Sequence, residues 1–166
     1  MAASGERSAL VLTASDGVTA GVRDDVSGSR VAERLADLGF DVRRIALPDD
    51  QADLEAALRS GAEAHDLIVT TGGTGLTPRD VTPQATKAVV TYEVPGMAEA
   101  MRATGRAVTP LADLSRGIVG VIGRTLVVNL PGSPKGAIES LDAIVPVLDH
   151  ALETLAGPHD HGEAGS

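Results

Sequence analysis

The chain has 166 residues, of which 43% are apolar and 1% aromatic, so we expect one domain with an aliphatic core. A net charge of −9, with almost no aromatic residue to stack on bases, argues against a nucleic-acid partner. Without cysteine there are no disulfides or thiolate metal sites, and without a membrane-length or signal-like segment we expect a cytoplasmic protein that contacts no membrane.

The first part of the chain predicts a strand, a helix and a second strand. Residues 8–15 form a short apolar run between polar segments, which is typical of a buried strand. Ser27 is a suitable N-cap for the helix that follows, and Gly39 is a good residue to end it. A second strand is expected at 40–47.

The same alternation continues in the middle of the chain. A helix is expected at 51–63 with Asp50 as its N-cap, followed by a third strand at 66–72. Thr82 is the expected N-cap of the next helix, which has proline in its first turn and runs over 83–93.

The last third predicts a helix, two strands and a long helix. The helix at 97–105 follows a Pro-Gly break, and the strands at 117–123 and 124–130 flank a tight turn. The final helix spans 133–156, and Pro146 must kink or split it.

Strands that alternate with helices predict an α/β fold: three layers, with a mostly parallel sheet and helices on both faces. We assign residues 1–157 to one domain and expect the tail, 158–166, to be disordered. Ligands of such sheets bind beyond the carboxyl ends of the strands. Two glycine- and proline-rich loops follow such ends, at 70–80 and 129–136.

The first loop, TTGGTGLTPRD (70–80), holds three glycines and four threonines. Small residues let backbone N–H groups converge on an anion, and threonine hydroxyls add donors. The spacing is neither that of a Walker A loop nor that of a GxGxxG fingerprint, so an ordinary strand-to-helix turn remains the alternative. The contacts of an anion-binding loop would be Thr71, Gly72, Gly73, Thr74 and Gly75.

Two aspartates follow strand ends. Asp80 closes the first loop, where it is either a carboxylate that holds Mg²⁺ beside a bound phosphate or an ordinary surface residue. Arg79, next to it, could neutralise phosphate charge. Asp49 follows the second strand and is free to face the same edge of the sheet, because Asp50 is the better helix cap.

The second loop, NLPGSPKG (129–136), pairs Asn129 at a strand end with a helix that starts at Ser133. A helix N-terminus offers free N–H groups and the positive end of its dipole to an anion, and Lys135 adds a cation. A strand–turn–helix connection that Ser133 merely caps explains the pattern equally well.

Ser115 and Arg116 precede the strand at 117–123. Facing a phosphate they would be ligands, because arginine binds phosphate bidentately; otherwise they belong to a solvated turn. The histidines suggest no site, and neither a Ser-His-Asp order nor an HExxH motif is present.

Three stretches together resemble a known family. They are TTGGTGLTPRDVTPQAT, PGMAEAMR and LSRGIVGVIGRTLVVNLPGSPKG, and they occur in the family's order. This combination is similar to the MogA/MoaB family of molybdenum-cofactor biosynthesis proteins, of which the gephyrin G domain is a relative. The match runs from about Leu10 to about Leu155, which is essentially the whole domain.

The resemblance implies a homotrimeric α/β protein that binds molybdopterin. In the MogA branch it implies a nucleotidyltransferase that moves AMP from Mg-ATP to the terminal phosphate of the pterin and releases pyrophosphate. A MoeA-type partner would then use the adenylylated pterin for molybdate insertion. Because the nucleophile is the substrate's own phosphate, catalysis needs positioning and charge neutralisation rather than a nucleophilic side chain.

The resemblance also implies site residues. Asp49 and Asp80 match two essential aspartates, which we expect to be catalytic and to hold Mg²⁺. The remaining contacts to pterin and nucleotide match Thr71, Gly72, Gly73, Thr74, Gly75, Ser115, Arg116, Asn129, Pro131, Gly132 and Ser133. Asp25 is a further candidate acidic ligand.

The branch within the family stays open. The D-x-S-G form of the loop TAGVRDDVSG is typical of MoaB-like members, whereas TPRD-T-P favours MogA-like activity. One alternative is therefore a molybdopterin-binding protein without transferase activity. Another is a nucleotide pyrophosphatase of the kind associated with CinA-type proteins.

Overall fold

The computed structural model describes residues 5–158. The tail expected to be disordered, 158–166, lies outside this range apart from its first residue. Strands and helices alternate along most of the chain, as the sequence predicts. The strands are β1 (Ser8–Ala14), β2 (Asp41–Leu47), β3 (Leu67–Thr71), β4 (Tyr92–Glu93), β5 (Val119–Ile122) and β6 (Thr125–Leu130). The helices are α1 (Asp16–Thr19), α2 (Val26–Asp37), α3 (Gln51–Ala64), α4 (Thr82–Val89), α5 (Pro95–Arg106), the 3-10 helix η1 (Pro110–Leu114) and α6 (Pro134–Ala156).

The six strands form one sheet in the order β2-β1-β3-β6-β5-β4. The first four are parallel, so their carboxyl ends meet at one edge of the sheet. Strand β5 runs antiparallel to β6, and β4 runs antiparallel to β5; β5 and β6 form a hairpin whose turn holds Gly123 at a φ of +60°. The predicted mostly parallel sheet is confirmed.

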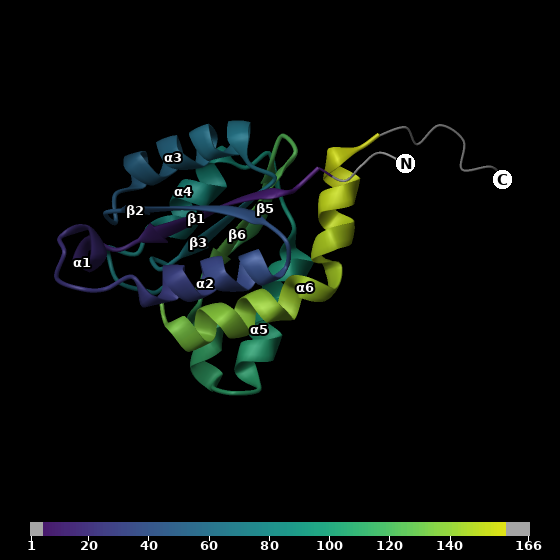
Figure 1. Ribbon diagram of the computed structural model, residues 1–166. Coiled ribbons are helices and arrows are strands. Elements are labelled where there is room, and N and C mark those ends of the chain that lie inside the picture. Colours follow the sequence, from purple (N-terminus) through teal and green to yellow (C-terminus); the bar gives the residue numbers. More distant parts are fainter. Residues whose placement is uncertain (1–4, 159–166) are drawn as a thin grey trace.

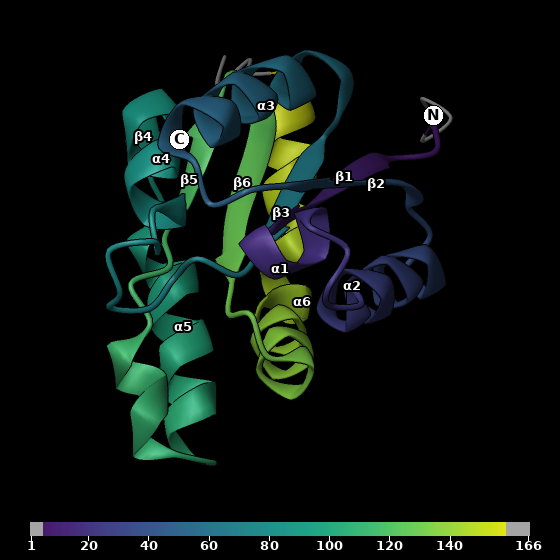
Figure 2. The same cartoon turned by 90° about the vertical axis from the view of Figure 1, so that its left-hand side faces the viewer.

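Helices cover both faces of the sheet, which gives three layers (Figures 1 and 2). Helices α2, α5 and α6 pack on one face, and α3 and α4 on the other. Alternate residues of each central strand point to opposite faces. In β1, Val11 packs towards α2 and α6, whereas Leu12 packs towards α3. Both faces are therefore buried, as the continuous aliphatic runs of the strands predict.

Two helix starts differ from the prediction. Asp25, not Ser27, is the N-cap of α2: its carboxylate accepts a hydrogen bond from Gly28 N at 3.0 Å. The hydroxyl of Ser27 instead donates to the carbonyl of Gly132 in a distant loop. Thr82 is the first residue of α4 rather than its cap: Val81 is the N-cap, and its carbonyl accepts from Ala85 N.

Two further boundaries and three short elements differ from the prediction. Helix α4 ends at Val89, since the next residue is extended and leads into β4, which pairs with β5. Helix α5 begins at Pro95 instead of after it, as proline is well suited to a first turn. The short helices α1 and η1 were not predicted; both are too short to show a helical periodicity in the sequence.

Helix α6 runs from the side of the sheet where the parallel strands end to the side where they begin. Ser133 caps its start at the carboxyl edge, and Figure 1 shows the helix changing direction along its length, as expected for a helix that contains Pro146. Its end reaches the opposite edge, where Arg124 donates to Ala156 O at 3.1 Å. Strand β1 begins at this same opposite edge, at Ser8. Between residues 5 and 158 there is no helix long and apolar enough to span a membrane.

Candidate functional site

Two cavities lie side by side at the carboxyl edge of the parallel strands. The aspartate cavity, of about 540 Å³, is bounded by the loops that follow β1, β2, β3 and β6. The apolar cavity, of about 400 Å³, is bounded by the loops after β3 and β6 together with α5, η1 and α6. The position agrees with the rule that ligands of open α/β sheets bind beyond the carboxyl ends of the strands.

The predicted site residues divide between these cavities. The aspartate cavity is lined by Asp49, Thr71, Gly72, Gly73, Asp80 and Gly132. The apolar cavity is lined by Thr74, Gly75, Ser115, Asn129 and Pro131. Ser133 lines both, and Arg116 lines neither. The two loops singled out in the sequence thus come together.

The glycines after β3 allow the chain to reverse against its neighbours. Gly72 and Gly73 have φ values of +86° and +69°, which disfavour residues with a side chain. A Cβ on Gly72 would lie 2.5 Å from Ala14 O, and one on Gly73 would overlap the hydroxyl of Thr82. A Cβ on Gly132 would lie 3.3 Å from the Cα of Gly72. The two loops can therefore approach each other backbone to backbone.

Asp49 is held by a reciprocal pair of hydrogen bonds with Asp16, at the start of α1. Asp16 N donates to Asp49 Oδ2 at 3.0 Å, and Asp49 N donates to Asp16 Oδ1 at 3.0 Å. The other oxygen of Asp49, Oδ1, accepts no hydrogen bond from the described part of the chain and lies near Gly73. That oxygen remains available to a ligand.

The surroundings of Asp49, above all its burial, disfavour the ionised form of its carboxyl. Burial raises the pKa of the Asp49 carboxyl, and the carboxylates of Asp16 and Asp80 raise it further. The hydrogen bond from Asp16 N and the charge of Arg79 act in the opposite direction. A cation bound beside Asp49 would relieve this accumulation of negative charge.

Asp80 lies at the other side of the aspartate cavity and shapes its own loop. Its Oδ2 accepts from Thr77 N at 2.9 Å and from Thr77 Oγ1 at 2.8 Å. Its Oδ1 accepts no hydrogen bond from residues 5–158. Asp80, like Asp49, therefore offers one carboxylate oxygen to a ligand.

These oxygens fit a hard divalent cation better as partial ligands than as a complete site. No group of three or more His, Cys, Asp or Glu in the described chain is arranged to hold a metal ion. Mg²⁺ bound in proteins keeps few carboxylate ligands and completes its shell with waters and substrate phosphates. Asp49 and Asp80 are suited to that mode of binding.

Arg116 fixes the TGGTG loop (71–75) and the residues after it through hydrogen bonds to their backbone carbonyls. Its Nε donates to Gly75 O at 2.8 Å, its Nη2 to Asp80 O at 2.8 Å and its Nη1 to Gln84 Oε1 at 3.2 Å. Its backbone N–H also donates to Thr74 O. The guanidinium thus fixes both ends of the segment 75–80, while its expected contact with a phosphate stays a prediction.

Asp25, the further acidic candidate, also lines the aspartate cavity, but its carboxylate is occupied. One oxygen caps α2, and the other accepts from Thr13 Oγ1 at 2.9 Å and from Arg44 at 3.1 Å. Thr71 Oγ1 in turn donates to Thr13 Oγ1 at 3.2 Å. This network fixes Thr71 at the cavity wall.

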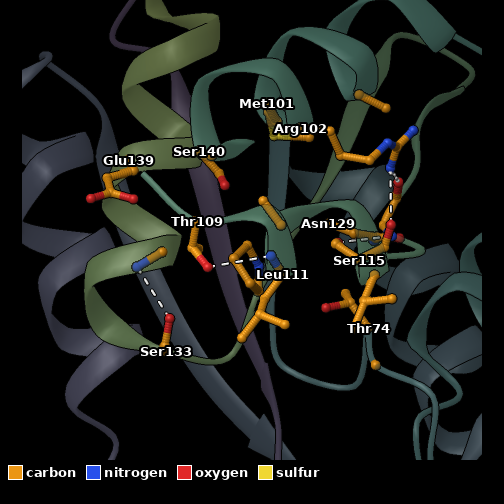
Figure 3. Close-up of a pocket in the computed structure, with 18 residues that line it drawn as sticks. Thr74, Met101, Arg102, Thr109, Leu111, Ser115, Asn129, Ser133, Glu139 and Ser140 are labelled. Atoms are coloured by element: carbon orange, nitrogen blue, oxygen red, sulfur yellow. Dashed lines mark hydrogen bonds between the residues drawn. The ribbon is translucent and has the colours of Figure 1, made fainter. Parts of the chain in front are cut away.

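The apolar cavity is enclosed by α5 and η1, which the sequence patterns did not mark as part of the site, and by the first turns of α6, whose start they did mark (Figure 3). Met101 and Arg102 come from α5, Leu111 from η1 and Ser140 from α6. Arg102 donates to Gly117 O at 2.9 Å and to Ser115 O at 3.3 Å, which fixes the backbone next to Ser115. The stretch PGMAEAMR was the only signal of this wall, because it matches the family without containing any catalytic pattern.

Asn129 lines the apolar cavity, but its amide is engaged within the protein. Its Nδ2 donates to Thr70 Oγ1 at 3.1 Å and to Thr86 Oγ1 at 3.0 Å, and its Oδ1 accepts from Ile118 N at 3.2 Å. The side chain is 1% exposed. It connects β3, α4, β6 and the approach to β5, so its contribution to ligand binding remains a prediction.

Ser133 stands where the two cavities meet. It is the N-cap of the long helix α6, and its hydroxyl accepts from Gly136 N at 3.2 Å (Figure 3). Pro134 has no N–H, and the N–H groups of Gly136 and Ala137 donate to Ser133, so the helix offers the junction of the cavities its dipole and the N–H of Lys135. An anion at this point could be shared by ligands on both sides.

This chain is similar to known proteins in both sequence and fold. A family model described as a probable molybdopterin binding domain matches residues 10–150. A molybdopterin adenylyltransferase from Helicobacter pylori is 38% identical over 154 residues, covering 89% of this chain and 86% of the relative. The crystal structure of the molybdopterin biosynthesis enzyme MoaB from Thermus thermophilus has a TM-score of 0.84 at 49% identity, covering 91% of this chain and 97% of that one. The Mog protein from Mycobacterium ulcerans has a TM-score of 0.86 at 42% identity, covering 90% and 99%.

Proposed function

The chain belongs to the family of probable molybdopterin binding domains, and we propose that it is a molybdopterin adenylyltransferase. It is a nucleotidyltransferase that moves AMP from ATP to the phosphate of molybdopterin. The observation that carries the assignment is the junction of two cavities at the N-terminus of α6. A transferase with two substrates needs such neighbouring sites, because the reacting groups must meet with their orientation fixed.

We assign molybdopterin to the apolar cavity and ATP to the aspartate cavity. Met101 and Leu111 offer apolar surface to the pterin, and Ser133 lies where its phosphate would end. The TGGTG loop separates the cavities, with Thr74 and Gly75 on the pterin side and Gly72 and Gly73 on the nucleotide side. Both assignments follow from the polarity of the walls.

The reaction needs no nucleophilic side chain. A phosphate oxygen of the pterin attacks the α-phosphorus of ATP, the bond from that phosphorus to the bridging oxygen breaks, and pyrophosphate leaves. The N-terminal end of α6, with the N–H of Lys135, and the backbone of Gly73 stabilise charge on the phosphates, whereas Gly72 N already donates to Leu130 O. The protein thus contributes positioning and electrostatics.

Mg²⁺ is part of this proposal. The free oxygens of Asp49 and Asp80 would hold the ion, which supplies charge neutralisation to the phosphates when bound. The raised pKa of Asp49 supports this role, because a bound cation would stabilise the ionised carboxylate. The homotrimer and the MoeA-type partner implied by the resemblance remain predictions, as does the cytoplasmic location expected from the sequence.

The test is an assay for adenylylated molybdopterin and pyrophosphate from molybdopterin, ATP and Mg²⁺. We expect product from the native chain and a loss on the order of 100-fold or more in Asp49→Asn and Asp80→Asn, since each removes a charge at the reacting phosphates. Asp142→Asn is the control, because Asp142 lies in α6, pairs with Arg34 and lines neither cavity. Tight pterin binding without pyrophosphate release would favour the MoaB-like alternative, and nucleotide hydrolysis without pterin would favour a CinA-like pyrophosphatase.

A further inference from the structure

Arg79 contacts the loop that follows β1, although its own loop follows β3. Its Nε donates to Asp16 Oδ2 at 3.0 Å, and its Nη2 donates to Asp16 Oδ1 at 2.9 Å. This is a bidentate contact, in which two nitrogens of one guanidinium donate to the two oxygens of one carboxylate; lysine cannot make it. Asp16 lies at the first position of α1, directly after its N-cap Ser15.

The carboxylate of Asp16 is fully used by this contact and by Asp49. Its Oδ1 accepts from both Arg79 Nη2 and Asp49 N, and its Oδ2 accepts from Arg79 Nε. In return, Asp16 N donates to Asp49 Oδ2. A chain of contacts therefore runs from Arg79, in the loop after β3, through Asp16 to Asp49, and of the two Asp49 carboxylate oxygens only Oδ1 is left for a ligand.

We propose that Arg79 and Asp16 are positioning residues that fix Asp49 in the orientation needed for adenylyl transfer. The inference rests on the proposed function and adds two residues to its site. Neither residue lines the aspartate cavity or needs to touch a substrate. Their effect is to leave Asp49 one orientation, in which Oδ2 is held by Asp16 N and Oδ1 points towards Gly73.

The exposure of the pair supports positioning rather than stability as its role. The side chains of Arg79 and Asp16 are 65% and 46% exposed. Exposed ion pairs add little to the free energy of folding. A bidentate pair between two loops nevertheless restricts how those loops move relative to each other, and both loops bear on the aspartate cavity.

The experiment compares Arg79→Gln, Arg79→Lys and Asp16→Ala with the native chain. Arg34→Gln is the matched control, because Arg34 pairs with Asp142, a carboxylate that is also 46% exposed but joins α2 to α6. For each variant we would measure kcat, the KM for molybdopterin, the melting temperature and the ¹H–¹⁵N resonance of the Asp49 amide. The resonance reports the hydrogen bond to Asp16 Oδ1 without any turnover.

We expect kcat to fall about 10-fold in Arg79→Gln and Asp16→Ala, because small misplacements of a reacting group cost factors of this order. The KM for molybdopterin should stay within about twofold, and the melting temperature within about 2 °C, since the pair contributes little stability. Arg79→Lys should not restore kcat, as an ammonium cannot hold both oxygens. The Asp49 amide resonance should move in Asp16→Ala and stay in Arg34→Gln.

A native chain that makes no adenylylated pterin would refute the proposed function, and the amide resonance would still decide the inference. An unchanged Asp49 resonance in Asp16→Ala overturns it. With an active native chain, a kcat for Arg79→Gln within about twofold of native also overturns it, as does full activity in Arg79→Lys. A fall in melting temperature that accounts for the lost activity would point to a structural role and count against positioning.

Discussion

Asn129→Ala separates a structural role of this residue from the ligand role that the sequence suggested. The amide is buried and makes three hydrogen bonds within the protein. Replacement by alanine leaves the backbone N–H of Ile118 without its acceptor. Thr86 is affected less, because its hydroxyl still donates to Thr82 O.

The size of the effect follows from these contacts. A buried donor that loses its partner costs about 1–3 kcal/mol, and the removed side-chain atoms leave a small void. We therefore expect Asn129→Ala to lower the free energy of unfolding by about 3 kcal/mol. For a domain of this length that corresponds to a fall in melting temperature of about 6–12 °C.

Urea denaturation followed by circular dichroism measures this loss, and molybdopterin titration measures binding in the same samples. Thr70→Val is the matched control, since it removes one partner of Asn129 but leaves the bond to Ile118. It should cost only about 1 kcal/mol. A loss below about 1 kcal/mol in Asn129→Ala, together with a collapse of pterin affinity, would refute the structural reasoning and restore the ligand role.

Three further predictions concern the same loops. Asp49→Asn should lower transfer by about 100-fold or more, yet raise the melting temperature at neutral pH. The reason is that the raised pKa of Asp49 means its ionised form costs stability above that pKa, so the gain should vanish as the pH falls to the ordinary carboxyl range in a pH series of melting curves. Arg116→Lys should lower kcat about 10-fold and speed proteolysis of the segment 75–80, because one ammonium cannot replace three guanidinium contacts; unchanged cleavage would contradict this. Gly73→Ala should cost more than about 2 kcal/mol in urea denaturation, since it adds a steric overlap with Thr82 to a strained φ, whereas Gly39→Ala, with φ +94° and open space around it, should cost about 1 kcal/mol; equal losses would show that the overlap is relieved.

The sequence predicts those parts of the fold that depend on local patterns. Aliphatic runs mark β1, β3 and β6, and the caps Asp50 and Ser133 stand directly before their helices. Asp25 and Ser27 are both good capping residues, so no local rule could choose between them. The choice is made by Thr13 and by the carbonyl of Gly132, which lie far away in the chain.

The candidate site is predicted less completely, because its walls come from distant segments. The loops at 70–80 and 129–136 were marked by their glycines and by their places after strands. The wall formed by Met101 and Leu111 carries no such pattern. Helix α1, whose Asp16 contacts Asp49, has only four residues and is too short to be predicted from periodicity. Whether Asn129 binds a ligand or the protein depends on Thr70 and Thr86, which are 59 and 43 residues away.

Both described ends of the chain lie on the side of the sheet where the parallel strands begin, which is opposite the cavities. Strand β1 starts there at Ser8, and α6 finishes there at Ala156, held by Arg124. A purification tag or a second catalytic domain attached through either end would therefore leave the mouths of both cavities clear. Covalent fusion to a second enzyme, and attachment to a surface through either end, are compatible with this architecture without any rearrangement of the site.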